Sequence, residues 1–259
     1  MQMEVYNIFK VNFKREWIQM KRYLPNTISE LIIFYIVFLG FFLGISLIGD
    51  PENLDYNIQM IIMNYIFWYL VLSLTQGIGL EISDEAGRGT LEQLTITPYK
   101  LWFIFITRMT SVIIISMISI SILLFLAMLT TRQNLNLDLL SIIPILLITL
   151  IGVLGVGYLI SSITIIIKES GYLIQIFQFV IMGMTFIPLT TAPFLKFAPF
   201  MYGLQLIREI TINNFSILSL NINDIVFLLL NSLIYFITGI YVFNRAEKFA
   251  KQKGLLGHY

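Results

Sequence analysis

Six long apolar runs constrain the fold of this chain more than any other feature. A helix needs about 20 residues to cross roughly 30 Å of hydrocarbon, and it cannot carry unpaired charges through the lipid. The runs that meet this condition are Leu31–Gly49, Tyr56–Leu80, Met109–Thr131, Leu139–Ile167, Ser170–Leu195 and Ile225–Asn244. Only helices and closed barrels satisfy every backbone hydrogen bond in lipid, and these runs lack the alternation of barrel strands. We therefore predict an all-α, polytopic membrane protein with six transmembrane helices.

The distribution of lysine and arginine predicts the orientation, because positive residues are retained on the cytoplasmic side. With the N-terminus inside, thirteen basic residues fall in inner segments, and three fall in outer segments, namely Arg132, Lys196 and Arg208. We predict a multi-pass protein of the cell membrane with both termini in the cytoplasm. The cytoplasmic tail is expected at 247–259. The formal net charge of +1 argues against nucleic acid as a partner, because phosphates require a concentrated basic surface.

Residues 1–25 have the pattern of an amphipathic helix. Val5, Phe9, Phe13 and Trp17 recur at spacings of four, and basic residues between and after them can contact lipid headgroups. We predict an interfacial helix that binds membrane lipids and ends at Pro25, where the chain turns into the bilayer. The pattern leaves open whether this helix also docks on a partner.

The chain carries little that could perform catalysis. It has no cysteine, and its one histidine is His258. These counts exclude disulfides and thiolate metal ligands and make a histidine-based triad implausible. No glycine-rich loop ends in Gly-Lys-Ser or Gly-Lys-Thr, so this type of phosphate-binding loop is also absent from the sequence. We predict no enzyme activity, no catalytic residue and no metal or cofactor site in this chain.

A charged interruption at 81–100 divides the predicted domain 26–246. It combines four acidic residues with two glycines and Arg88 between two apolar runs. A loop that only sets topology rarely needs such a mixture, so we interpret the segment as a surface for a partner protein in the aqueous phase. The alternative is a solvated loop.

A second unusual segment, 188–222, is too interrupted to span and too apolar for a free loop. Pro188, Pro193 and Pro199 break the helix that precedes it, and Tyr202 begins a mixed polar and apolar stretch. We predict a re-entrant or interfacial hairpin on the outer side. It would be either a cap over the bundle or an extracellular gate.

Two features inside or beside the spans have alternative explanations. Gly152, Gly155 and Gly157 are expected to let neighbouring helices approach closely, although a flexible point in a moving helix would also use glycine. Glu30, at the inner edge of the first run, is expected to have a structural role, since it can reach water or pair with a nearby basic residue. An ion relay through Glu30 is the functional alternative.

The order of these parts resembles the type-two ABC exporter permeases. An amphipathic N-terminal helix, two spans, a cytoplasmic segment, two more spans and a fifth span leading to a proline-rich hairpin follow one another as in that family. The most specific part is Gly89-Thr90-Leu91-Glu92-Gln93-Leu94, followed four residues later by Pro98. The family often has Glu-Arg-Glu, one residue and Gly-Thr, where this chain reads Glu85-Ala86-Gly87-Arg88-Gly89-Thr90.

The resemblance implies a division of labour. A separate ABC ATPase subunit would bind ATP and Mg²⁺, and this chain would form the substrate pathway with a second permease copy or a paralogue. The implied coupling helix includes Glu85, Gly89, Thr90, Leu91 and Glu92, with Glu81 and Asp84 as neighbouring candidates. Lys168 and Glu169, in the other short inner loop, would make a second contact with the ATPase.

Two further classes of function remain open at this stage. An ion-driven or passive transporter acting alone would depend on an intramembrane polar residue such as Glu30. A membrane scaffold or sensor subunit would have no stable ATPase partner. The sequence does not identify the substrate.

Overall fold

The computed structural model describes residues 2–49, 51–167 and 171–255, and every regular element within these ranges is helical. The prediction of an all-α fold is therefore confirmed. Short 3₁₀ turns lie at Pro51–Asn53, Pro193–Phe197 and Ile217–Ser219. The α-helices are α1 (Gln2–Arg22), α2 (Leu24–Ile48), α3 (Leu54–Gly87), α4 (Leu91–Ile96), α5 (Leu101–Thr131), α6 (Leu139–Thr164), α7 (Gly171–Phe186), α8 (Met201–Thr211) and α9 (Ile222–Gln252).

Five helices in the described ranges are long and apolar enough to cross a membrane: α2, α3, α5, α6 and α9. The run predicted as the fifth of six spans forms α7, which has 16 residues and ends at Phe186, two residues before Pro188. A helix of this length reaches only about 24 Å, less than the roughly 30 Å of a hydrocarbon core. Six full-length spans are thus not confirmed. The proline explains the early end, because it cannot continue the hydrogen-bond ladder.

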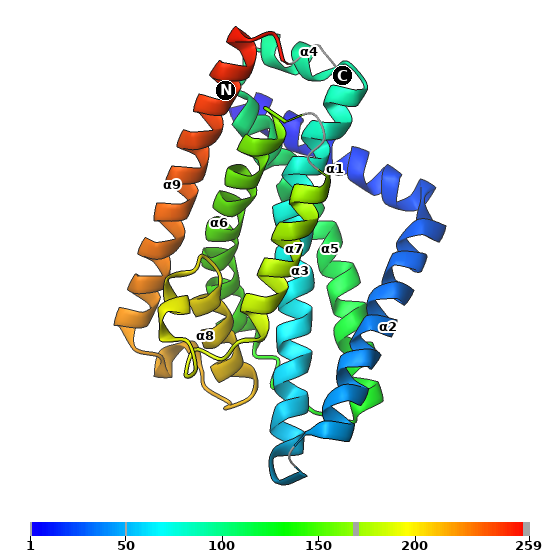
Figure 1. The fold of residues 1–259 in the computed structure, drawn as a ribbon, viewed down its shortest axis with the longest axis vertical. Helices are drawn as coiled ribbons and strands as arrows, with labels where there is room; N and C mark the ends of the chain where they lie inside the picture. The colour runs from blue at the N-terminus through cyan, green and yellow to red at the C-terminus, as the bar shows by residue number, and fades with distance from the viewer. Residues whose placement is uncertain (1, 50, 168–170, 256–259) are drawn as a thin grey trace.

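Helix α3 is the centre of the bundle (Figure 1). It packs against α2, α5, α6, α7 and α8, and 78% of its most apolar window is buried, against 6% for α2 and 11% for α5. Because α2 and α5 leave many Ile, Leu and Phe side chains exposed, these two helices have the surface expected of helices in contact with lipid.

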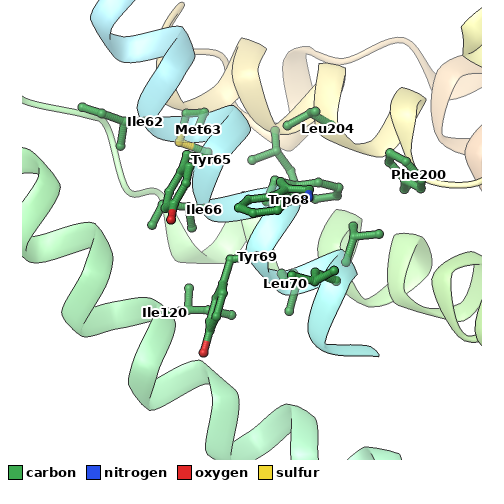
Figure 2. Packing of buried hydrophobic residues seen from close by; sticks show 14 of the residues in the cluster. Ile62, Met63, Tyr65, Ile66, Trp68, Tyr69, Leu70, Ile120, Phe200 and Leu204 are labelled. Atoms are coloured by element: carbon green, nitrogen blue, oxygen red, sulfur yellow. The ribbon is translucent and has the colours of Figure 1, made fainter. Parts of the chain in front are cut away.

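The largest buried cluster surrounds the middle of α3. In Figure 2 the side chain of Trp68 extends between α3 and α8, near Leu204, whereas Tyr65 and Tyr69 point toward the opposite side. Tyr65 donates a hydrogen bond to the backbone oxygen of Phe34 in α2, so one aromatic side chain both fills the core and fixes a neighbouring helix.

Helices α6 and α9 approach so closely that only glycine fits between them. A Cβ atom at Gly155 would overlap the backbone of Tyr235, and one at Gly239 would overlap the backbone of Gly155. A Cβ at Gly152 would lie 2.7 Å from the backbone oxygen of Pro199, and Gly157 faces α3. The predicted packing role of Gly152, Gly155 and Gly157 is confirmed.

The N-terminal region differs from prediction in one detail. Helix α1 ends at Arg22 and not at Pro25, and Pro25 lies in the first turn of α2. Proline is tolerated there because the first backbone N–H groups of a helix have no intrahelical acceptor. Helix α1 crosses the end of the bundle that carries α4 and packs on α5 (Figure 1). Its position at a membrane interface stays a prediction.

The two remaining segments also differ from their predicted boundaries. Helix α9 continues to Gln252, so residues 247–252 of the predicted tail are helical. The predicted hairpin at 188–222 contains α8, whose 11 residues cannot span a bilayer. Met201, Leu204 and Ile207 bury one face of α8 against the bundle, in the part of the molecule away from α4 (Figure 1).

Candidate functional site

The segment at 81–100 is a rigid connection between two long helices. Helix α3 continues through Glu85 to Gly87, and three residues, 88–90, connect it to α4. Gly89 has φ +70°, a left-handed conformation that glycine adopts without steric cost. The backbone N–H of Thr90 donates to the backbone oxygen of Glu85, and Leu91 is fully buried. Helix α4 is therefore fixed to α3 on one face and leads into α5 within a few residues.

Side-chain ion pairs join this segment to α5 and α1. Arg108 of α5 donates to Glu81 at 2.9 Å and to Glu85 at 2.7 Å. Arg15 of α1 lies 3.2 Å from both carboxylate oxygens of Glu81. Glu85 also accepts a hydrogen bond from the hydroxyl of Thr90, the residue before α4. We call Arg15, Glu16, Glu81, Glu85 and Arg108 the charged cluster.

The charged cluster contains more carboxylates than guanidinium groups. Glu16 of α1 has one buried oxygen, Oε1, without a hydrogen-bond partner in the structure. Burial raises the pKa of the Glu16 carboxyl above its usual value, and the negative charge of Glu81 raises it further, while Arg15 and Arg108 oppose these effects. Glu16 is thus the member of the cluster whose ionised form is least stabilised.

One neutral contact extends the attachment of α1. The side-chain amide of Asn12 donates to the hydroxyl of Thr107 at 2.8 Å, and both residues are buried. Sequence reasoning did not select Asn12, Arg15, Glu16 or Arg108 as site residues. The available signal was the spacing of Glu81 and Glu85, which places both carboxylates on one helical face and requires a facing cation.

The opposite face of the segment is accessible. Asp84 and Arg88 are exposed and lie 3.9 Å apart, and Glu92 and Gln93 are exposed on α4. Ile96, the last residue of α4, is 79% exposed, whereas Leu91, the first residue of the same helix, is fully buried. We call Asp84, Arg88, Glu92, Gln93 and Ile96 the exposed tip. Its mixture of charges around one apolar side chain is suited to contact with a protein.

The predicted coupling residues thus separate into two groups. Asp84, Gly89 and Glu92 are exposed, and Thr90 is half-buried. The side chains that point into the protein are Glu81, Glu85 and Leu91, where the carboxylates pair with arginine. Lys168 and Glu169 lie outside the described residues.

The predicted outer gate residues do not form one cluster. Pro188 and Pro193 are exposed, whereas Pro199 is buried where its backbone oxygen faces Gly152 of α6. Tyr202 of α8 donates to Asp224 at 2.6 Å, and its ring centroid lies 4.9 Å from that of Phe227 in α9. Tyr202 therefore joins α8 to the start of α9.

A buried arginine holds α8 from its other side. Arg208 is 3% exposed; it donates to Asn64 Oδ1 of α3 at 2.8 Å and to the backbone oxygen of Thr185 in α7 at 2.9 Å. These two hydrogen bonds to oxygen acceptors stabilise the buried charge of the guanidinium. Within the described residues its partners are neutral, in contrast to those of Arg108.

A cavity of about 1040 Å³ is lined by residues of α1, α2, α3 and α5. Glu30, Phe34 and Tyr69 line it, and Gln178 of α7 closes another side, where it accepts a hydrogen bond from Gln76 at 3.1 Å. Tyr69 donates to Glu30 at 3.2 Å. Glu30 is thus an exposed residue of the cavity wall with a tyrosine partner, and among the described residues it forms no ion pair; of the two predicted alternatives, access to water and pairing with a basic residue, the exposure fits the first.

Comparison with known proteins does not assign the chain to a family. No protein-family model matches it, and no curated protein matches it. The functional conclusion therefore rests on the residues and their geometry.

Proposed function

We propose that this chain is the permease subunit of an ATP-driven exporter of the type-two ABC class. The observation that carries the proposal is the construction of the segment at 81–100. One face of this segment is fastened to α1, α3 and α5, and its other face carries the exposed tip. A partner that moves the exposed tip would displace three helices together.

In this proposal a separate ABC ATPase subunit binds ATP and Mg²⁺ and receives the exposed tip in a surface cleft. Ile96 is the apolar anchor, and Asp84, Arg88 and Glu92 provide charges around it. Nucleotide-driven movement of the ATPase displaces α4, and Arg108 carries this displacement to α5 because it holds both Glu81 and Glu85. Glu81 and Glu85 are then positioning residues within the permease, and they do not touch the partner.

The proposal also specifies the arrangement in the membrane. The end with α1 and α4 faces the cytoplasm, in agreement with the distribution of basic residues. Helix α1 lies at the inner interface against lipid headgroups, and α7, although short, enters the bilayer as a sixth segment followed by a re-entrant element that contains α8. Two permease copies, or this chain and a paralogue, enclose the pathway and expose it by alternating access or by lateral uptake from the inner leaflet.

In the same scheme the segment at 188–222 is the outer gate. Tyr202 contacts α9 and Arg208 contacts α3 and α7, so movement of these helices would be passed to α8. In this scheme Tyr202 and Arg208 are the residues that connect the gate to the neighbouring helices. The three prolines only shape the chain around it.

A transporter that acts alone is the second candidate, because Glu30 lines a cavity within the bundle. That function predicts substrate flux that is insensitive to ATP and lost in the variant Glu30→Gln. The permease function predicts flux that requires the ATPase. A scaffold would give neither result.

The first test is purification of the tagged chain from its native cell in mild detergent, followed by mass spectrometry and an ATPase assay. We expect a stoichiometric ATPase subunit that is lost in Glu92→Lys and in Ile96→Asp. Gln252→Lys, an exposed substitution near the end of α9, is the control and should retain the subunit. A chain that is folded and purifies without an ATPase contradicts the proposal.

A further inference from the structure

We propose that the cavity between α1–α2 and α3–α5 binds the ammonium group of an amphipathic cation, with Glu30 as the counter-ion and Phe34 and Tyr69 as aromatic walls. The assignment of this ligand as the exported substrate rests on the proposed function. The binding site itself rests on the geometry of the cavity.

Glu30 is the central residue of this site. Its carboxylate accepts one hydrogen bond, from Tyr69 at 3.2 Å, and no ion pair involves it within the described parts of the chain. Glu30 is exposed and lines the cavity, so its carboxylate is accessible to a ligand that enters there. A ligand ammonium would supply the missing positive charge.

Two aromatic rings stand beside this carboxylate. Phe34 follows Glu30 by four residues on α2, so both side chains lie on one face of the helix. The ring centroids of Phe34 and Tyr69 are 4.5 Å apart, in an edge-on arrangement, and both residues line the cavity. The faces of such rings attract ammonium groups, and the attraction is stronger where water is excluded. A carboxylate next to two rings therefore favours a cation over a neutral or anionic group.

The rest of the wall defines the other parts of the ligand. Hydroxyl and amide side chains can bind uncharged polar groups, and they are followed by apolar side chains that suit a hydrocarbon tail. The polar members include Ser73, Gln76, Ser116, Ser119 and Gln178, Glu16 is a second carboxylate in the wall, and the apolar members include Leu72, Val112 and Ile115. A volume of about 1040 Å³ can hold a whole amphiphile of moderate size.

Two arginines, Arg22 and Arg88, also line the cavity, but they do not reverse its preference for a cation. Arg88 pairs with exposed Asp84 at 3.9 Å, and Arg22 lies over the ring of Tyr23 at 5.7 Å. Arg22 is the last residue of α1, and Arg88 directly follows α3, whereas Glu30 is within α2.

Binding to the purified full-length chain tests the site without the ATPase. The chain is placed in nanodiscs of an uncharged glycolipid without amines, and the probe is radiolabelled dodecyltrimethylammonium. We expect saturable binding that excess unlabelled probe displaces, and that dodecyl maltoside and dodecyl sulfate do not displace. Glu30→Gln keeps the size of the side chain and the acceptor for Tyr69, so loss of the charge alone should raise Kd about tenfold to a hundredfold.

Two further variants and a control separate the parts of the site. Phe34→Leu should raise Kd about two- to fivefold, because one ring face is lost. Tyr69→Phe keeps the ring and should have less effect than Glu30→Gln. Asp55→Asn removes an exposed carboxylate at the far end of α3, outside the cavity, and should leave Kd unchanged.

Two natural sources could provide the ammonium, and the same assay distinguishes them. If phosphatidylethanolamine added to the nanodisc raises the apparent Kd of the wild type, the ligand is a lipid headgroup; if it does not, the ligand is a free amphiphile. Absence of saturable binding, or equal binding by wild type and folded Glu30→Gln, overturns the site. If the ATPase still co-purifies in that case, the permease function stands and only the ligand is wrong.

Discussion

The charged cluster and the contact between α6 and α9 hold the bundle together in different ways. At the end with α4, the charged cluster joins three helices, α1, α3 and α5, through long side chains, and one cation, Arg108, holds two carboxylates. Past the middle of α6 and α9, Gly155 and Gly239 bring the backbones of these two helices into direct contact. Ion pairs between long side chains can exchange partners, whereas a backbone contact cannot shift without separating the helices. The contrast favours motion at the α4 end and rigidity between α6 and α9.

Placing a large side chain in the contact between α6 and α9 should have the largest effect on stability. Gly155→Leu places a side chain where the backbone of Tyr235 lies, so we expect the loss of at least about 3 kcal/mol and little monodisperse protein. Gly183→Leu in α7 is the control, because no atom lies within 4 Å of its added Cβ. Size-exclusion profiles and thermal unfolding measure the difference. Equal stability of the two variants would contradict the rigid contact.

Removal of the Arg108 charge should have the second-largest effect on stability. Arg108→Gln leaves Glu81 and Glu85 close together with less positive charge, so we expect a loss of about 3 kcal/mol. Adding Glu85→Gln should recover part of this loss, since one uncompensated charge disappears. Thermal unfolding of both single variants and the double variant gives the coupling energy. Additive effects would show that the pair does not interact.

Arg208 provides the matched comparison at the other end. Arg208→Gln leaves Asn64 and the Thr185 carbonyl, both neutral, without their donor. We expect a smaller loss, about 2 kcal/mol, because no uncompensated charge remains. The same unfolding assay ranks the two arginines. A larger loss for Arg208 than for Arg108 would reverse the proposed contrast.

Glu16 should have the smallest effect, and the effect should depend on pH. Its pKa is raised in the folded protein, so folding favours the protonated form, and this contribution is lost as pH rises through the folded pKa. Glu16→Gln removes the ionised form and should raise Tm at neutral pH by about 1–2 °C. The gain should disappear below the unfolded pKa of glutamate, about 4.3. A gain that persists at low pH would point to packing instead.

Much of the fold could be predicted from the sequence, because charge-free length alone decides which segments can span lipid. The positions of α2, α3, α5, α6 and α9 follow from that rule, and the packing role of Gly155 follows from its place in a span. The length of α7 was predicted wrongly because the apolar run continues beyond Phe186. The break at Pro188 was itself expected from the sequence, and the helix ends two residues before it.

The candidate site was less predictable. The segment at 81–100 was identified from its charges, but the inward direction of Glu81 and Glu85 depends on α3 continuing to Gly87 and on Arg108, which is 27 residues from Glu81. The contact with Arg15 spans 66 residues. Such pairings are decided by how the helices pack, as is the cavity around Glu30, and no local pattern reports them.

Cross-linking from the exposed tip tests most directly whether α4 docks on an ATPase. The chain has no cysteine, so Ile96→Cys introduces a single reactive thiol at the tip, and Leu218→Cys, at a residue 94% exposed at the other end, is the control. With a thiol-reactive photo-cross-linker in native membranes, we expect a product between Ile96→Cys and an ABC ATPase that changes with nucleotide, and none from Leu218→Cys. No product from Ile96→Cys, or equal products from both positions, would contradict the permease function.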